Sequence, residues 1–277
     1  MKKRLRLLII LIIVVIIGFS VFVLIKKISQ RNNKKIKVSG NIEATDVRLS
    51  FRVAGKIKEL LTDEGRMVKT AVPVARLETD ELTQIRDKAS ASLKAAQFQY
   101  ELDKVDYERA ENLFKEGSIS AQKRDVAKTK ADADKANVEA LKAELDLANT
   151  RLGFAELVST IDGFVLVKSA EAGENVQVGS TVFTVADLRD IWLTAYINET
   201  DLGRVKLNQP VEIKTDTYRN KVYKGRISFI SQEAEFTPKQ IQTTEERVKL
   251  VYRIKIQVDN TDLELKPGMP ADGYIIE

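Results

Sequence analysis

The stretch 53–77, VAGKIKELLTDEGRMVKTAVPVARL, and the stretch 161–185, IDGFVLVKSAEAGENVQVGSTVFTV, carry one glycine-punctuated pattern twice. Each copy alternates β-branched residues with polar ones and places glycine where a turn is needed, which is typical of short strands. The copies keep register without a gap, and the matched pairs are Gly55 with Gly163, Ile57 with Val165, Gly65 with Gly173, Val68 with Val176, Val74 with Val182, and Leu77 with Val185. We therefore predict that 50–78 and 157–187 are two halves of one small β domain.

The insertion between the halves, 79–156, is predicted to be an α-helical hairpin. Gly117 is the only glycine between Gly65 and Gly153, and no proline lies between Pro73 and Pro210. This distribution permits two long helices with a turn near Gly117, and Ser118 or Ser120 is suited to start the second helix. Apolar residues recur at spacings of three and four, as in an antiparallel coiled coil; they are Leu82, Ile85, Ala89, Leu93, Ala96 and Tyr100, then Val138, Leu141, Leu145, Ala148, Leu152 and Ala155.

A first helix from Glu78 to Glu116 would be roughly 55 to 60 Å long at the standard rise. So long a hairpin, with a narrow alanine-rich seam, has too little apolar area for a core of its own. Its length therefore indicates that the hairpin extends to a distant partner or forms an assembly surface.

The C-terminal part, 188–277, is predicted to form a small antiparallel β-barrel with membrane-proximal strands. Polar turns separate β-branched and aromatic runs at 191–197, 211–213, 222–230, 248–258 and 273–276. The segment 232–246, which is rich in Gln, Thr and Glu, is predicted to be a long loop.

The N-terminal part is predicted to anchor the chain in a membrane. Residues 7–25 form an almost unbroken apolar run, roughly 28 Å long as a helix, which is close to the thickness of the bilayer hydrocarbon. A cleaved signal peptide with Gly18 and Ser20 at its processing site is the alternative, but the apolar run continues past them and favours an uncleaved anchor. Residues 1–6 would then be a cytoplasmic tail and 26–49 an extended membrane-proximal segment.

The charge distribution argues against nucleic-acid binding. Ten basic residues precede the first acidic residue, Glu43; without them, 45 Lys and Arg become 35 against 40 Asp and Glu. The excess therefore belongs to the flanks of the apolar run, where anionic lipid attracts it. The positive-inside rule alone would place 26–37 in the cytoplasm, so the flanking charges leave the orientation open.

Composition also bounds the chemistry. The chain has no cysteine and no histidine, which removes the thiolate nucleophile, the usual general base and the commonest metal ligand. It also lacks the Gly-x-x-x-x-Gly-Lys-Ser/Thr loop that cradles nucleotide phosphates. We expect no catalytic, cofactor-binding or metal-binding residues and no enzyme activity.

The order of these parts resembles the periplasmic adaptor, or membrane fusion protein, family of HlyD type. The turn 265–270 (LKPGMP) is similar to the C-terminal signature of that family, and 236–239 (FTPK) with 245–248 (EERV) is similar to its adaptors of ABC-type exporters. The resemblance implies an elongated, multidomain, mixed α and β fold: a transmembrane helix, a split lipoyl-like β domain interrupted by a coiled-coil hairpin, then the barrel.

The same resemblance implies a function. The chain would link an inner-membrane transporter, of ABC type by this likeness, to a TolC-type outer-membrane channel in a tripartite efflux or secretion system. It would be a single-pass inner-membrane protein of a Gram-negative bacterium with its bulk in the periplasm. It would also self-associate into a ring, hexameric by family resemblance.

Three residues near the hairpin turn match the family members that dock onto TolC-type channels. These carry an Arg, a Leu four residues later and a Ser seven residues after that, and Arg109, Leu113 and Ser120 fall on those spacings. An Arg offers a forked donor, a Leu fills a groove, and a Ser hydroxyl bonds across an interface. The alternative is that Arg109 is a solvated charge, Leu113 a seam residue and Ser120 an ordinary N-cap.

Three other functions are open to a chain with these parts. A lipoyl or biotin carrier needs its modified lysine on the turn between the halves, where the hairpin is inserted instead. A coiled-coil scaffold without channel docking shares the hairpin but predicts no sensitivity at its tip. A substrate-binding accessory protein would need a pocket between modules, whereas Trp192 and Phe183 are expected in the core.

Overall fold

The computed structural model describes residues 35–236 and 250–276, which fall into two compact units. One unit is Asp46–Asp187; the other combines the chain up to Thr45 with the chain from Leu188 onward. The predicted tail (1–6) and anchor (7–25) lie outside the described residues. Within the described ranges, none of the helices is both long enough and apolar enough to cross a bilayer.

The duplicated motif forms one β module within the unit Asp46–Asp187. The first copy supplies β2 (Gly55–Leu60), β3 (Met67–Val68) and β4 (Pro73–Leu77). The second supplies β6 (Gly163–Lys168), β7 (Asn175–Val176) and the start of β8 (Thr181–Asn198), after the short β5 (Glu156–Val158). The copies exchange strands, since β2 pairs with β7 and β3 pairs with β6.

Equivalent residues of the two copies make equivalent hydrogen bonds. The N–H of Gly65 donates to the carbonyl of Val165 over 2.9 Å, and the N–H of Gly173 donates to the carbonyl of Ile57 over 2.8 Å. Both glycines have a positive φ, 74° and 92°, which favours glycine at these turns. The alignment made from sequence is therefore confirmed, and the module is one core made by both halves; its fully buried side chains include Phe51, Ile57, Leu77, Val182, Phe183 and Val185.

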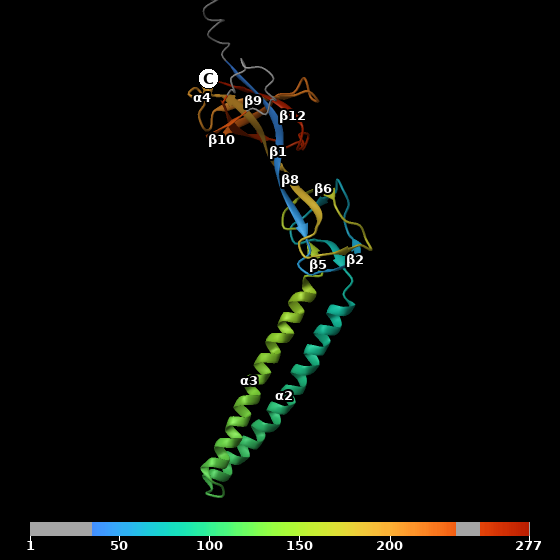
Figure 1. Cartoon of the computed structure of the whole chain (residues 1–277), viewed down its shortest axis with the longest axis vertical. Coiled ribbons are helices and arrows are strands. Elements are labelled where there is room, and N and C mark those ends of the chain that lie inside the picture. Colours follow the sequence, from blue (N-terminus) through green and yellow to red (C-terminus); the bar gives the residue numbers. More distant parts are fainter. Residues whose placement is uncertain (1–34, 237–249, 277) are drawn as a thin grey trace, which may run out of the picture. The chain divides into compact units, whose positions relative to one another are not determined.

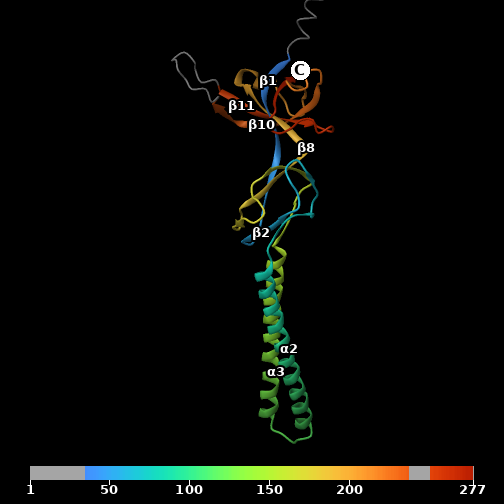
Figure 2. The ribbon, with the colours of Figure 1, turned by 90° about the vertical axis from the view of Figure 1, so that its right-hand side faces the viewer.

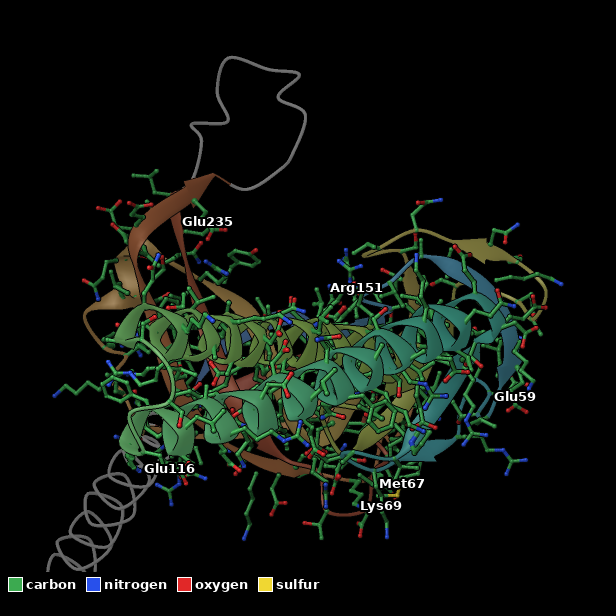
Figure 3. The ribbon with its side chains drawn as sticks, turned by 90° about the horizontal axis from the view of Figure 1, so that it is seen from below. Glu59, Met67, Lys69, Glu116, Arg151 and Glu235 are labelled. Atoms are coloured by element: carbon green, nitrogen blue, oxygen red, sulfur yellow. The ribbon has the colours of Figure 1, made fainter. Side chains whose placement is uncertain are left out.

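Two long antiparallel helices join the halves. Helix α2 (Asp80–Lys115, 36 residues) and helix α3 (Ala121–Gly153, 33 residues) run side by side in both views (Figures 1 and 2). At 1.5 Å per residue, α2 is about 54 Å long, as predicted. Figure 3 draws the side chains along both helices, with Glu116 labelled at the turn end of α2.

The seam of the hairpin agrees with the predicted spacing except at one position. Ala89, Ala96 and Ala148 are buried, whereas Ile85 is 44% exposed. Arg86 is the less exposed neighbour and takes the seam position instead. The prediction for Ile85 was wrong because the alternation of four and three that continues to Phe114 places residue 86, not 85, between Leu82 and Ala89.

The C-terminal strands close into an antiparallel barrel together with an N-terminal strand, so the described part of the segment 26–49, predicted to be extended and membrane-proximal, contributes a strand to the barrel. The neighbour order is β1 (Ile36–Ser50), β12 (Pro270–Ile275), β9 (Pro210–Thr215), β10 (Tyr223–Phe236), β11 (Leu250–Asp259) and β8, and β8 pairs back with β1. Gly40 stands where β1 meets β8, because a Cβ there would collide with the carbonyl of Thr194. The short helix α4 (Glu199–Leu202) follows β8.

The prediction of a loop at 232–246 is wrong for residues 232–236, which belong to a strand. Strand β10 continues to Phe236, and Ala234 pairs with Tyr252 of β11. Pairing with a neighbouring strand outweighs the weak strand propensity of the polar sequence there. The rest of the predicted loop lies outside the described residues. The barrel core is aliphatic, with Leu193, Ile213, Ile227, Ile254 and Ile256 fully buried.

Candidate partner-binding site at the hairpin tip

The turn of the hairpin is set by Gly117. The N–H of Ser118 donates to the carbonyl of Leu113 over 2.8 Å, and the N–H of Gly117 donates to the carbonyl of Phe114 over 2.9 Å. With φ of 72° at Gly117, this is a Schellman motif, which satisfies the last carbonyls of α2. The tip is therefore a defined turn of five residues, 116–120, between two regular helices.

The structure places the three predicted site residues around this turn. Arg109 and Leu113 are four residues apart on α2, so they lie one turn apart on neighbouring parts of its surface. Ser120 is the N-cap of α3, and its Oγ accepts a hydrogen bond from the N–H of Lys123 over 3.4 Å. Of the two serines considered for this cap, it is Ser120 that serves.

All three side chains are accessible. The Arg109 side chain is 70% exposed and its Nη1 donates to Oδ1 of Asp106 over 3.1 Å, which leaves most of its guanidinium donors facing water. Leu113 is 43% exposed, and Phe114 rather than Leu113 faces the other helix. The alternative that Leu113 is a seam residue is therefore wrong, while a cap role for Ser120 and an ion pair for Arg109 are both present.

Phe114 and Arg124 brace the tip from inside. The guanidinium carbon of Arg124, in the first turn of α3, lies 4.4 Å from the centre of the Phe114 ring. Its Nη2 also lies 2.6 Å from Oδ1 of Asp125. Such a cation–π contact stabilises a partly exposed site modestly. Phe114 and Arg124 could have been predicted as seam residues, because their positions continue the spacing of three and four along each helix. The prediction missed them because neither residue is aliphatic.

A polar layer interrupts the seam further along the hairpin. Asp103 of α2 is 2% exposed; its carboxylate accepts from Nζ of Lys130 over 2.7 Å and from Nε2 of Gln99 over 2.9 Å. Hydrogen bonds from Asp134, Lys130 and Gln99 lower the pKa of Asp103 to about 2. The same contact with Asp103, together with burial, raises the pKa of Asp134 on α3. One proton shared by the two carboxyl groups therefore suits this layer.

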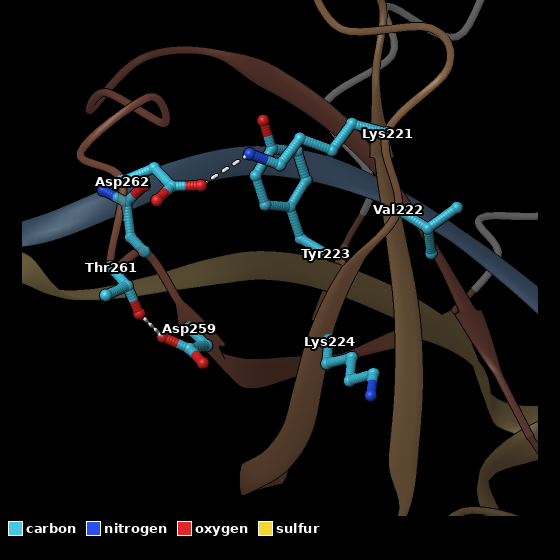
Figure 4. Close-up of a pocket in the computed structure, with 8 residues that line it drawn as sticks. Lys221, Val222, Tyr223, Lys224, Asp259, Thr261 and Asp262 are labelled. Carbon is cyan, nitrogen blue, oxygen red and sulfur yellow. Dashed lines mark hydrogen bonds and ion pairs between the residues drawn. The ribbon is translucent and has the colours of Figure 1, made fainter.

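A shallow hollow on the barrel has polar groups that are already paired with one another. It measures about 210 Å³ and is lined by Lys221 to Lys224 and Asp259 to Asp262 (Figure 4). Nζ of Lys221 is held by Asp262 at 2.7 Å and by Glu264 at 2.6 Å, and Oγ1 of Thr261 donates to Asp259. These groups satisfy one another and tie two loops together. Across the described ranges, no three acidic side chains are placed to hold a metal ion.

Trp192 differs from its expected core position. Phe183 is fully buried as predicted, but Trp192 is only partly buried on the outer side of β8. Its Nε1 donates to Thr194 Oγ1 over 3.0 Å and to Glu43 Oε2 over 3.2 Å, and Nζ of Lys255 lies 4.3 Å from its ring. Strand alternation places Trp192 opposite the buried Ile191 and Leu193, so the register within β8 would have predicted it.

Comparisons with known proteins agree with this architecture. Residues 191–272 match the family described as the YknX-like beta-barrel domain. A UPF0194 membrane protein of Citrobacter koseri is 29% identical over 295 residues, which cover 87% of this chain and 88% of that protein.

Two solved structures share the fold. MacA from Actinobacillus actinomycetemcomitans has a TM-score of 0.74 at 24% identity, over 88% of this chain and 79% of MacA. The membrane fusion protein Spr0693 from Streptococcus pneumoniae R6 has a TM-score of 0.67 at 18% identity, over 87% of this chain and 98% of Spr0693. Together, these comparisons show that residues 191–272 form a YknX-like β-barrel domain, that the chain is similar to a membrane protein over most of its length, and that it has the fold of MacA and of the membrane fusion protein Spr0693.

Proposed function

We propose that this protein is the adaptor subunit of a tripartite efflux or secretion system, joining an ABC-type inner-membrane transporter to a TolC-type outer-membrane channel. One observation carries the proposal: a hairpin of 36- and 33-residue helices ends in a hydrogen-bonded turn around which Arg109, Leu113 and Ser120 are all exposed. A helix pair about 50 Å long brings such a group to a partner that a compact domain would not reach.

The tip chemistry fits the end of a partner helix. The free donors of Arg109 suit carboxylates or terminal helix carbonyls, which need external partners. Leu113 offers an apolar anchor beside it, off the seam and therefore free to enter a groove. The hydroxyl of Ser120 accepts one internal hydrogen bond and keeps its own proton for donation.

The barrel is proposed to contact the transporter. Three aromatic side chains, Trp192, Tyr196 and Phe229, are wholly or partly exposed on it, and Tyr196 and Phe229 are 44% and 41% exposed. Lys255 and Arg253 lie over the rings of Trp192 and Phe229. Exposed aromatics with adjacent cations are typical of protein interfaces. ATP would be hydrolysed by the transporter, since this chain has no nucleotide-binding loop.

The remaining parts complete the proposal. Residues 7–25 would anchor the chain in the inner membrane of a Gram-negative bacterium, with the rest in the periplasm. Copies would associate into a ring, hexameric by family resemblance, so that the hairpins enclose a path for the exported substrate. Alkaline phosphatase fused at Glu277 should be active in this topology, and an inactive fusion would overturn it.

The tip is tested by replacing its side chains without unfolding the turn. Ser120→Asp keeps an N-cap oxygen, because Asp caps helices as well as Ser, and Arg109→Asp changes an exposed side chain. We expect both to reduce drug efflux and crosslinking to the outer-membrane channel, whereas Lys104→Asp, on an exposed part of α2 away from the tip, should not. Unchanged transport and crosslinking in Arg109→Asp and Ser120→Asp would reject docking at these residues.

The scaffold alternative rests on a specific observation. The N-cap bond of Ser120 and the ion pair of Arg109 give both residues a role inside the hairpin. If those roles are the whole function, Ser120→Asp, which keeps the cap, behaves as the parent chain.

The transporter partner is identified by purifying the protein from native membrane. A co-purifying ABC transporter supports the proposal, and a resistance-nodulation-division pump would refute the ABC assignment.

A further inference from the structure

A carboxyl pair lies between the two helices of the hairpin, and the proposed docking at the tip does not use it. Asp103 of α2 is 2% exposed, and its carboxylate already accepts hydrogen bonds from Lys130 and Gln99. Asp134 of α3 contacts the same carboxylate. Its oxygen Oδ2 is buried, and in the part of the chain that the structure describes no N–H or O–H group donates to it. Two carboxylates that face each other in this way repel unless one of them carries a proton.

The charged groups around the pair come from both helices. Nζ of Lys130 lies 2.7 Å from Oδ1 of Asp103, and Lys130 also attracts Asp134 and Asp106. Asp106 has a cation of its own, since Nη1 of Arg109 lies 3.1 Å from its Oδ1. The other titratable side chains on the seam nearby are Tyr100 and Tyr107. One lysine cannot offset two carboxylates, so a proton on Asp134 balances the charge of the layer.

The seam between this pair and the tip has little apolar packing. Ala131 is buried, and Tyr107, Ala110 and Ala127 are half-buried there. Toward the base the half-buried seam residues are larger, and they are Leu82, Leu93, Val138, Leu141, Leu145 and Leu152. Because alanine side chains bury little apolar area, an unbalanced charge in the layer weakens the distal part of the hairpin, residues 104–133, more than its base.

We propose that Asp103 and Asp134 form a proton-dependent latch: one proton shared between them keeps the distal part of the hairpin closed, and loss of that proton loosens it. The exposed tip residues of the two helices would then lose their fixed spacing, so the latch would regulate binding at the tip. That consequence rests on the proposed function, whereas the latch itself does not.

The latch is closed over a limited range of pH. The contact with Asp103, together with burial, raises the pKa of Asp134, so the closed hairpin keeps this proton at pH values where a solvated aspartate has lost it. Opening should become up to about tenfold more frequent for each pH unit between the ordinary aspartate pKa and the raised one, and should level off above it. On the acid side, protonation of Asp103, whose pKa is lowered to about 2, removes the charge that Lys130 pairs with.

Distances between two spin labels test the latch in the full-length chain, because the natural chain contains no cysteine. The helices are antiparallel and Asp103 meets Lys130, so Lys104 and Thr129 lie at the same height beside the latch, and both are exposed. We call the distance between labels on Lys104→Cys and Thr129→Cys the distal distance. As the pH rises from about 4 to about 8, its distribution should broaden toward longer values.

Two matched substitutions on α3 test the role of the proton. Asp134→Asn supplies a permanent N–H donor to Asp103 and should keep the distal distance constant across the pH series. Asp132→Asn removes an exposed carboxyl group two residues away and should behave as the parent chain. Labels on Gln84→Cys and Asn149→Cys, nearer the base, should keep their distance in every case. A distal distance that does not depend on pH in the parent, the same pH response in Asp134→Asn, or an equal change at the base would overturn the latch.

Crosslinking to the outer-membrane channel separates this inference from the proposed function. The crosslinking yield of Leu113→Cys in the parent, divided by its yield in Asp134→Asn, should fall as the pH rises, and this ratio cancels the pH dependence of the crosslinker. Crosslinking at every pH without a change in the distal distance removes the latch and keeps the proposed function. A pH-dependent distal distance without crosslinking at any pH keeps the latch and removes channel docking.

Discussion

The two copies of the β motif are related by sequence but are packed differently, and replacing Gly163 or Gly55 by alanine exposes the difference. A Cβ at residue 163 would lie 2.5 Å from the carbonyl oxygen of Ala186 and 2.8 Å from its carbon, both backbone atoms of β8. A Cβ at residue 55 would meet only the Leu77 side chain, at 3.1 Å. The cause is the continuation of the chain: β8 runs on past residue 185, whereas β4 ends at Leu77.

The magnitudes follow from these contacts. Overpacking against a fixed backbone costs about 1–3 kcal/mol, and a backbone neighbour favours the upper end. Alanine also stabilises by about 0.4–1 kcal/mol through the unfolded chain, since neither glycine has a positive φ. We expect Gly163→Ala to destabilise the module by about 2 kcal/mol. For Gly55→Ala, where Leu77 is free to shift, we expect a change of less than about 1 kcal/mol.

Hydrogen exchange of the β6 amides measures this locally. A loss of about 2 kcal/mol corresponds to roughly 30-fold faster exchange of the protected amides. Amides of β11, in the other compact unit, serve as the internal control and should keep their rates. Equal effects of the two substitutions would refute the reasoning from the contact with Ala186.

Three further predictions concern the hairpin and the barrel. The pKa of Asp103 is lower in the folded hairpin than in the unfolded chain, so the hairpin should lose stability as the pH falls from about 4 toward 2 and Asp103 becomes protonated. The pKa of Asp134 is higher in the folded hairpin than in the unfolded chain, so the hairpin should also lose stability as the pH rises through that raised pKa. Asp134→Asn should remove the second loss but not the first in circular-dichroism melts, and an unchanged pH profile would contradict the shared proton. Gly117→Ala, at φ of 72°, should destabilise the tip by about 1 kcal/mol, seen as faster exchange at 118–123 and not at 138–148. Ile256→Ala, fully buried in the barrel, should cost about 2–5 kcal/mol in urea unfolding followed by the fluorescence of Trp192, whereas Val222→Ala, 47% exposed, should cost little.

The sequence contained most of the fold because its two strongest signals agree. The glycine spacing of the duplicated motif marks turns that the backbone requires, and the gap in glycine and proline between the copies permits long helices. The predictions were wrong where pairing with a neighbouring strand determines how far a strand extends. Residues 187–190 include three charged residues, yet β8 runs through them, and β10 continues through 232–236, because both strands have a neighbouring strand.

The candidate site was predictable in part. Ser120 as a cap follows from residue type and position beside Gly117, and the exposure of Leu113 follows once Phe114 is placed on the seam. The seam itself was harder to predict, since Arg86, Asp103, Arg124 and Asp134 occupy positions where apolar residues were expected. Polar residues at such positions can be recognised as seam residues only when their partners on the other helix are known.

Crosslinking from the tip in living cells tests channel docking. Leu113→Cys is a unique cysteine in this chain, 43% exposed in the parent, and Lys104→Cys on the same helix is its control. A thiol-to-amine crosslinker should join Leu113→Cys, but not Lys104→Cys, to an outer-membrane channel, and Arg109→Asp should abolish the product. A correctly expressed Leu113→Cys chain that crosslinks only to itself would show that the tip does not dock onto a channel.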